Sequence, residues 1–276
     1  MYLICMKGYY NMDLTSPRTI RNIQEQFGFT FKKGLGQNFL TARNILEEIV
    51  DAAEIENGVI EVGPGFGVLT SELAQNSDKV VTIEIDERLI DVLDYTLAEY
   101  DNVKIINEDI LKLDLKKVID DEFNGEKVSI AANLPYYITT PIITKLLEEK
   151  LPIKNIVVMV QKEVAERMSA KPSTKDYGAI TVLCQYYTEP SIVANVPASL
   201  FVPPPKVDSA VLKLKILDKP SVEVKDEGVF FRVVKAAFSQ RRKTLLNCLS
   251  ANFPIPKDEI STLLESIGIA PSRRGE

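Results

Sequence analysis

The chain is 276 residues long, with 45% apolar and 26% charged residues, a composition typical of a globular protein with one large core and a small second domain. It contains no histidine, and its three cysteines (Cys5, Cys184 and Cys248) are far apart, so we expect no metal site and no histidine acid–base chemistry. The same cysteine usage predicts a reducing, cytoplasmic compartment. No apolar run is long enough to span a membrane, so we expect no membrane partner. The net charge of −6 and the pI of about 5.1 argue against a nucleic-acid partner for the chain as a whole.

Hydrophobic periodicity predicts strands that alternate with helices as far as residue 168, after an N-terminal extension and lead-in at residues 1–30. The expected strands are 58–62, 79–85, 103–107, 128–132 and 156–160, and the expected helices are 42–53, a segment ending at Leu73, 87–99, 141–149 and 162–168. This alternation is typical of βαβ units, so we expect a parallel sheet covered by helices on both faces.

The pattern changes after residue 168. Strands at 180–187, 191–196 and 209–216 follow one another with little helix between them, which predicts an antiparallel edge to the sheet. Helical periodicity returns from Val229 onward, after a polar linker around Pro220.

The charge is unevenly distributed along the chain. Residues 201–276 contain 13 Lys and Arg against 9 Asp and Glu, a net charge of +4, and the first 200 residues contain 20 against 30, a net charge of −10. A basic C-terminal part is what a local contact with a polyanion requires, although solvated surface charge accounts for the asymmetry about equally well.

A glycine-rich turn, Glu61-Val62-Gly63-Pro64-Gly65-Phe66-Gly67, follows the first strand of the alternating pattern. Glycines between a strand and a helix allow a tight turn and a close approach of the backbone to a ligand. Glu84 ends the next strand, where a carboxylate can accept both hydroxyls of a ribose. Asp109 ends the third strand, in position to bind an adenine amino group.

Two nucleotide cofactors suit this arrangement. A dinucleotide oxidoreductase uses Gly-x-Gly-x-x-Gly, but Val68 stands where the third glycine would be. The carboxylates of Glu61 and Asp109 suit the positive sulfonium of S-adenosylmethionine better than they suit a pyrophosphate. The sequence therefore favours S-adenosylmethionine.

The tetrapeptide Asn133-Leu134-Pro135-Tyr136 follows the fourth strand, at the edge where open α/β sheets bind substrate. An exocyclic aromatic amine is a poor nucleophile because its lone pair is delocalised into the ring. If the Asn133 side chain and the Leu134 carbonyl accept its two N–H bonds, the nitrogen becomes pyramidal and the lone pair is localised. Pro135 fixes the turn and Tyr136 can stack on the base, so catalysis is mainly orientation of an in-line displacement. A purely structural Asx-Pro turn has the same local pattern. The glycine-rich turn upstream nevertheless favours the interpretation of this tetrapeptide as the catalytic loop of a methyltransferase.

In order along the chain, these motifs resemble the KsgA family of ribosomal RNA adenine dimethyltransferases, from about Arg18 onward. Residues 33–40 are similar to the family's N-terminal cofactor motif, 61–70 to its glycine motif and 133–136 to its catalytic loop, and 161–167 and 201–209 are also family-like. The resemblance implies a Rossmann-like class I methyltransferase fold, with a mostly parallel seven-stranded sheet, an antiparallel edge and a small all-helical C-terminal domain. We place the methyltransferase domain at residues 31–217 and the helical domain, expected to contact ribosomal RNA, at residues 218–276.

The resemblance also implies roles for individual residues. The implied cofactor-binding residues are Asn38, Leu40, Gly63, Gly65, Glu84, Asp109 and Asn133. The implied catalytic residues are Asn133, Leu134, Pro135, Tyr136 and Phe201, the last as the second stacking face for the adenine. The basic run Arg241-Arg242-Lys243 is expected to open a helix that faces RNA phosphates.

The function implied is that of a monomeric cytoplasmic enzyme. It would transfer methyl groups from S-adenosylmethionine to N6 of two adjacent adenosines near the 3′ end of small-subunit (16S) ribosomal RNA, within an immature 30S particle. The first alternative is an antibiotic-resistance methyltransferase acting on large-subunit RNA, and the second is a mainly noncatalytic assembly factor. A nicotinamide oxidoreductase is the least favoured alternative.

Overall fold

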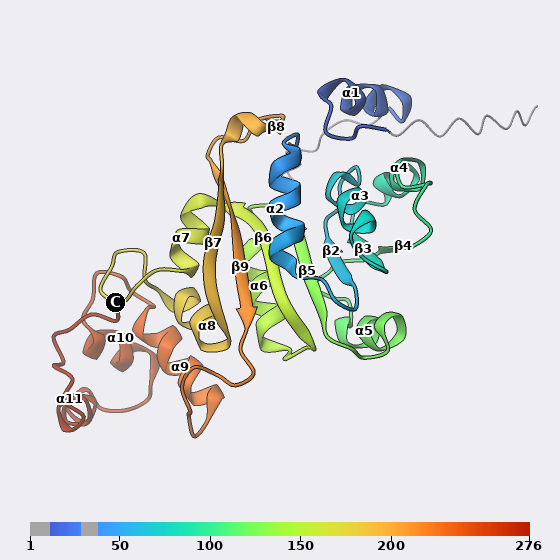
Figure 1. Cartoon of the computed structure of the whole chain (residues 1–276). Coiled ribbons are helices and arrows are strands. Elements are labelled where there is room, and N and C mark those ends of the chain that lie inside the picture. The colour runs from blue at the N-terminus through green and yellow to red at the C-terminus, as the bar shows by residue number, and fades with distance from the viewer. Residues whose placement is uncertain (1–11, 29–37) are drawn as a thin grey trace, which may run out of the picture. The chain divides into compact units, whose positions relative to one another are not determined.

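The computed structural model describes residues 12–28 and 38–276. Its main sheet has seven strands in the order β4-β3-β2-β5-β6-β9-β7, and a second, two-stranded antiparallel sheet pairs β1 with β8 (Figure 1). The strands are β1 (Phe39–Leu40), β2 (Val59–Val62), β3 (Val80–Glu84), β4 (Val103–Asn107), β5 (Val128–Asn133), β6 (Ile153–Gln161), β7 (Thr188–Val196), β8 (Phe201–Val202) and β9 (Ser209–Ile216).

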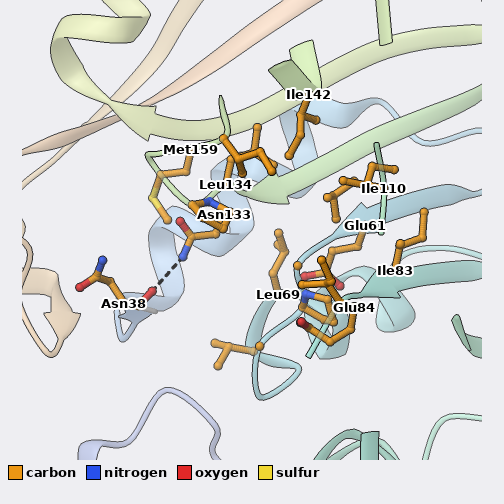
Figure 2. Close-up of a pocket in the computed structure, with 18 of the residues that line it drawn as sticks. Asn38, Glu61, Leu69, Ile83, Glu84, Ile110, Asn133, Leu134, Ile142 and Met159 are labelled. Atoms are coloured by element: carbon orange, nitrogen blue, oxygen red, sulfur yellow. Dashed lines mark hydrogen bonds between the residues drawn. The ribbon is translucent and has the colours of Figure 1, made fainter. Parts of the chain in front are cut away.

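The direction of the strands confirms a mostly parallel sheet with an antiparallel edge. β4, β3, β2, β5 and β6 pair in parallel, and β9 runs antiparallel to β6. The chain builds β2, β3 and β4 toward one edge and then crosses to β5 on the other side of β2. Ligands bind at such a topological switch point, beyond the carboxyl ends of the strands. Glu61 on β2 and Asn133 on β5 both line the pocket that lies there (Figure 2).

Helices precede, connect and follow these strands. The described helices are α1 (Pro17–Gln26), α2 (Arg43–Ala53), α3 (Val68–Gln75), α4 (Ile90–Thr96), α5 (Leu115–Phe123), α6 (Thr139–Glu148), α7 (Lys162–Met168), α8 (Ala179–Tyr187), α9 (Glu227–Ala237), α10 (Leu245–Asn252) and α11 (Lys257–Ser266), with two short 3₁₀ turns, η2 (Glu87–Leu89) and η3 (Ala198–Leu200). α2 packs on β5, β6 and α3, and α3 packs on β3. Among the described residues, no helix is long and apolar enough to cross a membrane.

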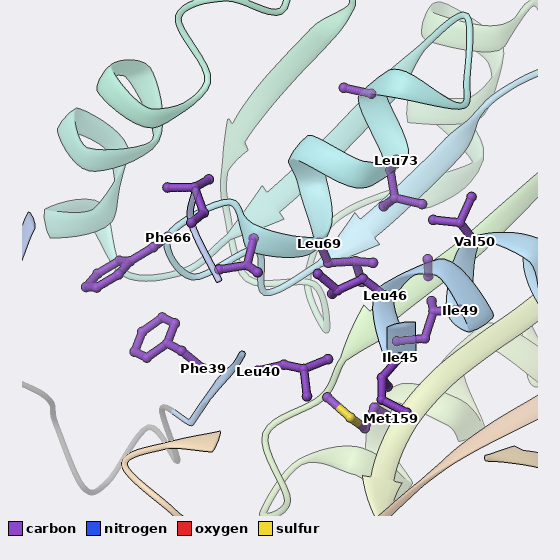
Figure 3. Packing of buried hydrophobic residues seen from close by; sticks show 14 of the residues in the cluster. Phe39, Leu40, Ile45, Leu46, Ile49, Val50, Phe66, Leu69, Leu73 and Met159 are labelled. Atoms are coloured by element: carbon purple, nitrogen blue, oxygen red, sulfur yellow. The ribbon is translucent and has the colours of Figure 1, made fainter. Parts of the chain in front are cut away.

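Two strands beneath the pocket are buried along their whole length and do not alternate between buried and exposed residues. Every residue of β2 and β3 is buried, as expected for parallel strands covered on both faces. Near the pocket, the rings of Phe39 and Phe66 stack with their centroids 4.3 Å apart, and Leu40 and Leu69 belong to the same cluster (Figure 3). The segment before α2 is thereby packed against the glycine-rich turn.

The prediction of a strand at 180–187 is wrong, because this segment is the helix α8. Its β-branched and aromatic residues favour a strand, but burial in a tertiary context overrides such preferences. The hydroxyl of Thr181 both accepts a hydrogen bond from the Gly178 N–H and donates one to the Arg167 carbonyl, which fixes the start of the helix. Tyr186, near its end, packs against Phe230 of α9 with a ring-centroid distance of 5.1 Å.

The chain divides into two compact units. The first comprises the described residues up to Lys162 together with Ser191–Lys215, and the second comprises Glu163–Pro190 with Ile216–Glu276. In the second unit α9, α10 and α11 share a small apolar core, so the predicted helical C-terminal region is confirmed as three helices. The domain boundaries given above remain a prediction.

Candidate active site

A pocket opens at the carboxyl ends of the central strands, within the first compact unit (Figure 2). The residues that line it include ten of those singled out from the sequence: Asn38, Leu40, Gly63, Gly65, Glu84, Asp109, Asn133, Leu134, Pro135 and Tyr136. Residues 33–37 of the N-terminal cofactor motif lie outside the described residues.

The glycine-rich turn has a backbone that only glycine adopts without strain. Gly63, Gly65 and Gly67 have φ values of +71°, +60° and +83°. A Cβ atom on Gly65 would lie 2.8 Å from Cε1 of Phe39, so a side chain there would collide with the core. The Gly63 N–H donates to the Ile83 carbonyl at 2.9 Å, which ties the turn to β3. The turn is therefore a rigid wall of backbone at which a ligand can approach closely.

Two carboxylates stand at the ends of β3 and β4. Glu84 is 6% exposed, and its Oε1 accepts the Asp86 N–H at 2.8 Å. Burial raises the pKa of Glu84 to about 6, against the opposing effect of the backbone N–H groups of Asp86 and Gly65. Oδ1 of Asp109 accepts the Leu111 N–H at 3.0 Å. Both carboxylates are oriented by their own loops and present acceptors to the pocket.

Glu61 is the most deeply buried carboxyl group of the pocket, at 1% exposure. The Thr70 hydroxyl donates to its Oε2 at 2.5 Å. Burial raises the pKa of Glu61 to about 8; Thr70 lowers it and nearby Glu84 raises it further. Within residues 12–28 and 38–276, no cationic side chain forms an ion pair with it. The floor of the pocket is thus rich in acceptors, and its buried carboxyl lacks a countercharge.

The catalytic loop begins with a side-chain amide whose orientation is fixed. Nδ2 of Asn133 donates to the Asn38 carbonyl at 3.0 Å (Figure 2). Because the NH₂ group is used in this way, the acceptor Oδ1 remains for a ligand. The N–H of the buried Leu134 donates to the Met159 carbonyl at 3.1 Å, which joins the loop to β6.

The two aromatic residues expected to stack on the base are placed differently. Tyr136 is half-buried in the pocket wall, and its hydroxyl is 2.7 Å from Oγ of Ser209. Burial raises the pKa of the Tyr136 phenol. Phe201 lies opposite Leu40 in the small sheet, is 2% exposed and belongs to the hydrophobic core, and it is not among the residues that line the pocket.

The basic run Arg241-Arg242-Lys243 lies in the second compact unit. It does not open a helix: it forms a turn closed by the Lys243 N–H donating to the Gln240 carbonyl at 3.0 Å, and Thr244 caps α10 after it. Nη2 of Arg241 donates to a backbone carbonyl at 2.9 Å, that of Lys175 in the same unit. The three basic side chains remain exposed.

The structure also reveals contacts that sequence reasoning missed. The Asn38 carbonyl and the Ser209 hydroxyl hold the catalytic loop, and Ser209 falls within the family-like segment 201–209, which was a usable signal. Tyr137 lines the pocket and directly follows the tetrapeptide. In the described part of the chain, no cluster of three acidic, cysteine or histidine side chains is arranged to hold a metal ion.

The strand order, the antiparallel β9 and the pocket at the switch point define a Rossmann-like class I methyltransferase. Residues 28–271 match the family model described as "Ribosomal RNA adenine dimethylase", so the chain belongs to that family of RNA-modifying enzymes.

Known relatives agree with this assignment. The chain is 54% identical over 270 residues to "Ribosomal RNA small subunit methyltransferase A" of Bacillus mycoides, an alignment that covers 96% of this chain and 92% of the relative. Among solved structures, a dimethyladenosine transferase from Plasmodium falciparum matches with a TM-score of 0.66 and 30% identity, covering 85% of this chain and 91% of that one. The 23S rRNA methyltransferase ErmE matches with a TM-score of 0.64 and 28% identity, covering 86% and 93%.

Proposed function

We propose that this protein transfers methyl groups from S-adenosylmethionine to N6 of two adjacent adenosines near the 3′ end of 16S ribosomal RNA, giving N6,N6-dimethyladenosine. The substrate is an immature small-subunit particle, and the enzyme acts in the cytoplasm as a monomer. The extensive identity to small-subunit methyltransferases supports this RNA over large-subunit RNA. The observation that carries the chemistry is the fixed amide of Asn133 at the edge of the pocket.

The pocket suits S-adenosylmethionine by the chemistry of its walls. Glu84 can accept ribose hydroxyls and Asp109 an adenine amino group, and Gly63 and Gly65 leave backbone room for the methionine portion. Among the described residues, no cationic side chain pairs with the buried carboxyl of Glu61, which suits a ligand that carries positive charge. When bound, the cofactor supplies an electrophilic methyl group on a sulfonium.

The catalytic loop then acts on the target amine. Oδ1 of Asn133 and the Leu134 carbonyl accept its two N–H bonds, which localises the nitrogen lone pair toward the methyl group. Tyr136, anchored by Ser209, stacks on the adenine. As the N–C bond forms, the bond between the methyl group and the sulfonium would break, and its electron pair would remain on sulfur. The nitrogen becomes positively charged and its proton passes to water, so no strong base is required. Orientation supplies most of the acceleration.

Phe201 is proposed as the second stacking face, and its ring must leave the core to act in this way, since it is 2% exposed. The basic run at 241–243 is proposed to bind RNA phosphates, because its three side chains are exposed.

A methylation assay tests the proposal. Purified protein is incubated with radiolabelled S-adenosylmethionine and with 30S particles that lack these methyl groups, and the RNA is digested and analysed by mass spectrometry. We expect dimethyladenosine at two adjacent positions. Labelling of large-subunit RNA instead would assign the protein to the resistance type, and particle binding without labelling would leave it an assembly factor.

A further inference from the structure

Exposed apolar side chains follow three strands at the edge of the sheet where the pocket opens. Ile85, Leu111 and Tyr137 follow the ends of β3, β4 and β5 and are 55%, 36% and 58% exposed. Ile85 and Tyr137 both line the pocket. Large apolar side chains that are exposed together beside a pocket are typical of surfaces that bind a ligand or a macromolecular partner.

The last residue of the 133–136 loop, Tyr136, and the tyrosine that follows it, Tyr137, have opposite environments. The ring of Tyr136 is half-buried, and its hydroxyl is held by Ser209. Tyr137 occupies the third position of a tight turn in which the Ile138 N–H donates to the Pro135 carbonyl at 3.1 Å. Over the described residues, no hydrogen bond or ring contact engages Tyr137. Its ring is therefore carried by a rigid turn and left unpartnered.

The position of Tyr137 indicates which ligand it meets. Ile85 adjoins Glu84, on the side of the pocket where the carboxylates suit the cofactor. Tyr137 follows β5, which lies on the opposite side of β2 from β3, and β5 ends at Asn133, whose amide oxygen is available for the target amine. The reacting adenine must enter the pocket as far as Asn133. The Tyr137 ring at the mouth of the pocket therefore meets the part of the RNA strand next to that adenine.

We propose that Tyr137 stacks on the RNA base next to the reacting adenine and so positions the nucleotide pair. This inference rests on the proposed function, in which the two target adenosines are neighbours. A base drawn from its stack into a pocket leaves the neighbouring base without a stacking partner. An aromatic face at the mouth restores that partner, and such stacking tolerates any base because every base has a π face.

The experiment compares Tyr137→Ala, Tyr137→Phe and Tyr137→Trp, with Tyr95→Ala as the control. Tyr95 lies on α4, is 43% exposed and does not line the pocket. We expect Tyr137→Ala to raise KM for undermethylated 30S particles by roughly tenfold, with kcat changed by less than about twofold and the calorimetric Kd for S-adenosylmethionine unchanged. Tyr137→Phe and Tyr137→Trp should retain the wild-type KM, because stacking needs a ring and not the hydroxyl. Tyr95→Ala should retain it because Tyr95 does not line the pocket.

Each outcome has one meaning. An unchanged KM in Tyr137→Ala overturns the inference, as does an equal loss in Tyr137→Phe, since that result assigns the effect to the hydroxyl. A change confined to the Kd for S-adenosylmethionine would place Tyr137 on the cofactor side and also reject it. If the wild-type enzyme makes no dimethyladenosine from the particles, the proposed function itself fails, and this result is distinguishable from failure of the stacking residue alone.

Discussion

The side-chain amide of Asn133 donates a hydrogen bond of 3.0 Å to the backbone carbonyl of Asn38, 95 positions earlier in the chain. Asn133 ends β5, and Asn38 directly precedes β1. The contact joins the loop proposed to be catalytic to the segment proposed to bind the cofactor, so one wall of the pocket also sets the orientation of the Asn133 amide.

Replacement of Asn133 tests this relationship. Asn133→Asp keeps the shape but cannot donate to the Asn38 carbonyl, and Asn133→Ala removes the acceptor as well. We expect kcat on 30S particles to fall by about 100-fold or more in both, the scale observed when one oriented hydrogen-bonding group is lost from an active site. The Kd for S-adenosylmethionine, measured by calorimetry, should change by less than about threefold.

Asn57→Ala is the matched control for these variants, because the Asn57 amide also donates to a backbone carbonyl, that of Lys127, at an exposed site. Wild-type turnover in Asn133→Ala would reject the proposed role of the loop.

Glu84 should make cofactor binding depend on pH. Burial raises the pKa of Glu84 from 4.5 to about 6, and the ionised form is the better acceptor for ribose hydroxyls. We therefore expect the contribution of Glu84 to the affinity for S-adenosylmethionine to be constant above pH 7 and to weaken as the pH falls through about 6. Glu84→Gln should bind roughly tenfold more weakly at pH 7.5 and should lose this dependence. The exposed neighbour Glu87→Gln is the control, and a wild-type affinity that is flat from pH 5 to 8 would contradict the expectation.

Because of Glu61, the free energy of unfolding of the ligand-free protein should decrease as the pH rises. Its pKa is about 8 in the folded state against an ordinary value of 4.5, so the folded state favours the protonated form. The stabilisation is complete below pH 4.5 and is lost as the pH rises through 8, at up to about 1.4 kcal/mol per pH unit. Glu61→Gln keeps a partner for Thr70 and does not titrate, so its free energy of unfolding should decline less over this range.

Urea unfolding of both proteins at pH 5, 6.5 and 8 measures the difference. Glu126→Gln, an exposed site, controls for the change in net charge. Parallel pH profiles for wild type and Glu61→Gln would show that the buried carboxyl does not titrate in this range.

β2 and β3 were predictable because parallel strands buried on both faces are continuous apolar runs. β4, β9 and the helix α7 coincide with the predicted segments. The helix α8 was not predicted, since its Ile, Thr, Val and Tyr residues favour a strand locally, whereas its packing on α9 joins segments far apart in the sequence. α1 and α5 were left unassigned by the sequence analysis, and each is a short amphipathic segment within polar sequence.

The position of the candidate site was predictable, but the partners within it were not. A glycine turn and a loop such as 133–136 are local patterns, and topology brings the ends of their strands together. The contacts of Asn133 with Asn38 and of Tyr136 with Ser209 join segments far apart in sequence. The burial of Phe201 likewise depends on its pairing with Leu40, which no local pattern reports.

Arg242 provides the test of the proposed RNA surface. Arg241 is tied to the Lys175 carbonyl, so its replacement would also disturb the local fold, whereas no such contact within the described part of the chain involves the exposed Arg242. Arg242→Glu should weaken binding to 30S particles and reduce the slope of log Kd against log salt by about 1, because each phosphate contact contributes about 0.7–0.9 to that slope. Lys257→Glu, an exposed position at the start of α11, makes the same change of charge elsewhere. Equal losses in the two variants would indicate a general effect of net charge, whereas a loss confined to Arg242→Glu would locate the phosphate contact at the turn before α10.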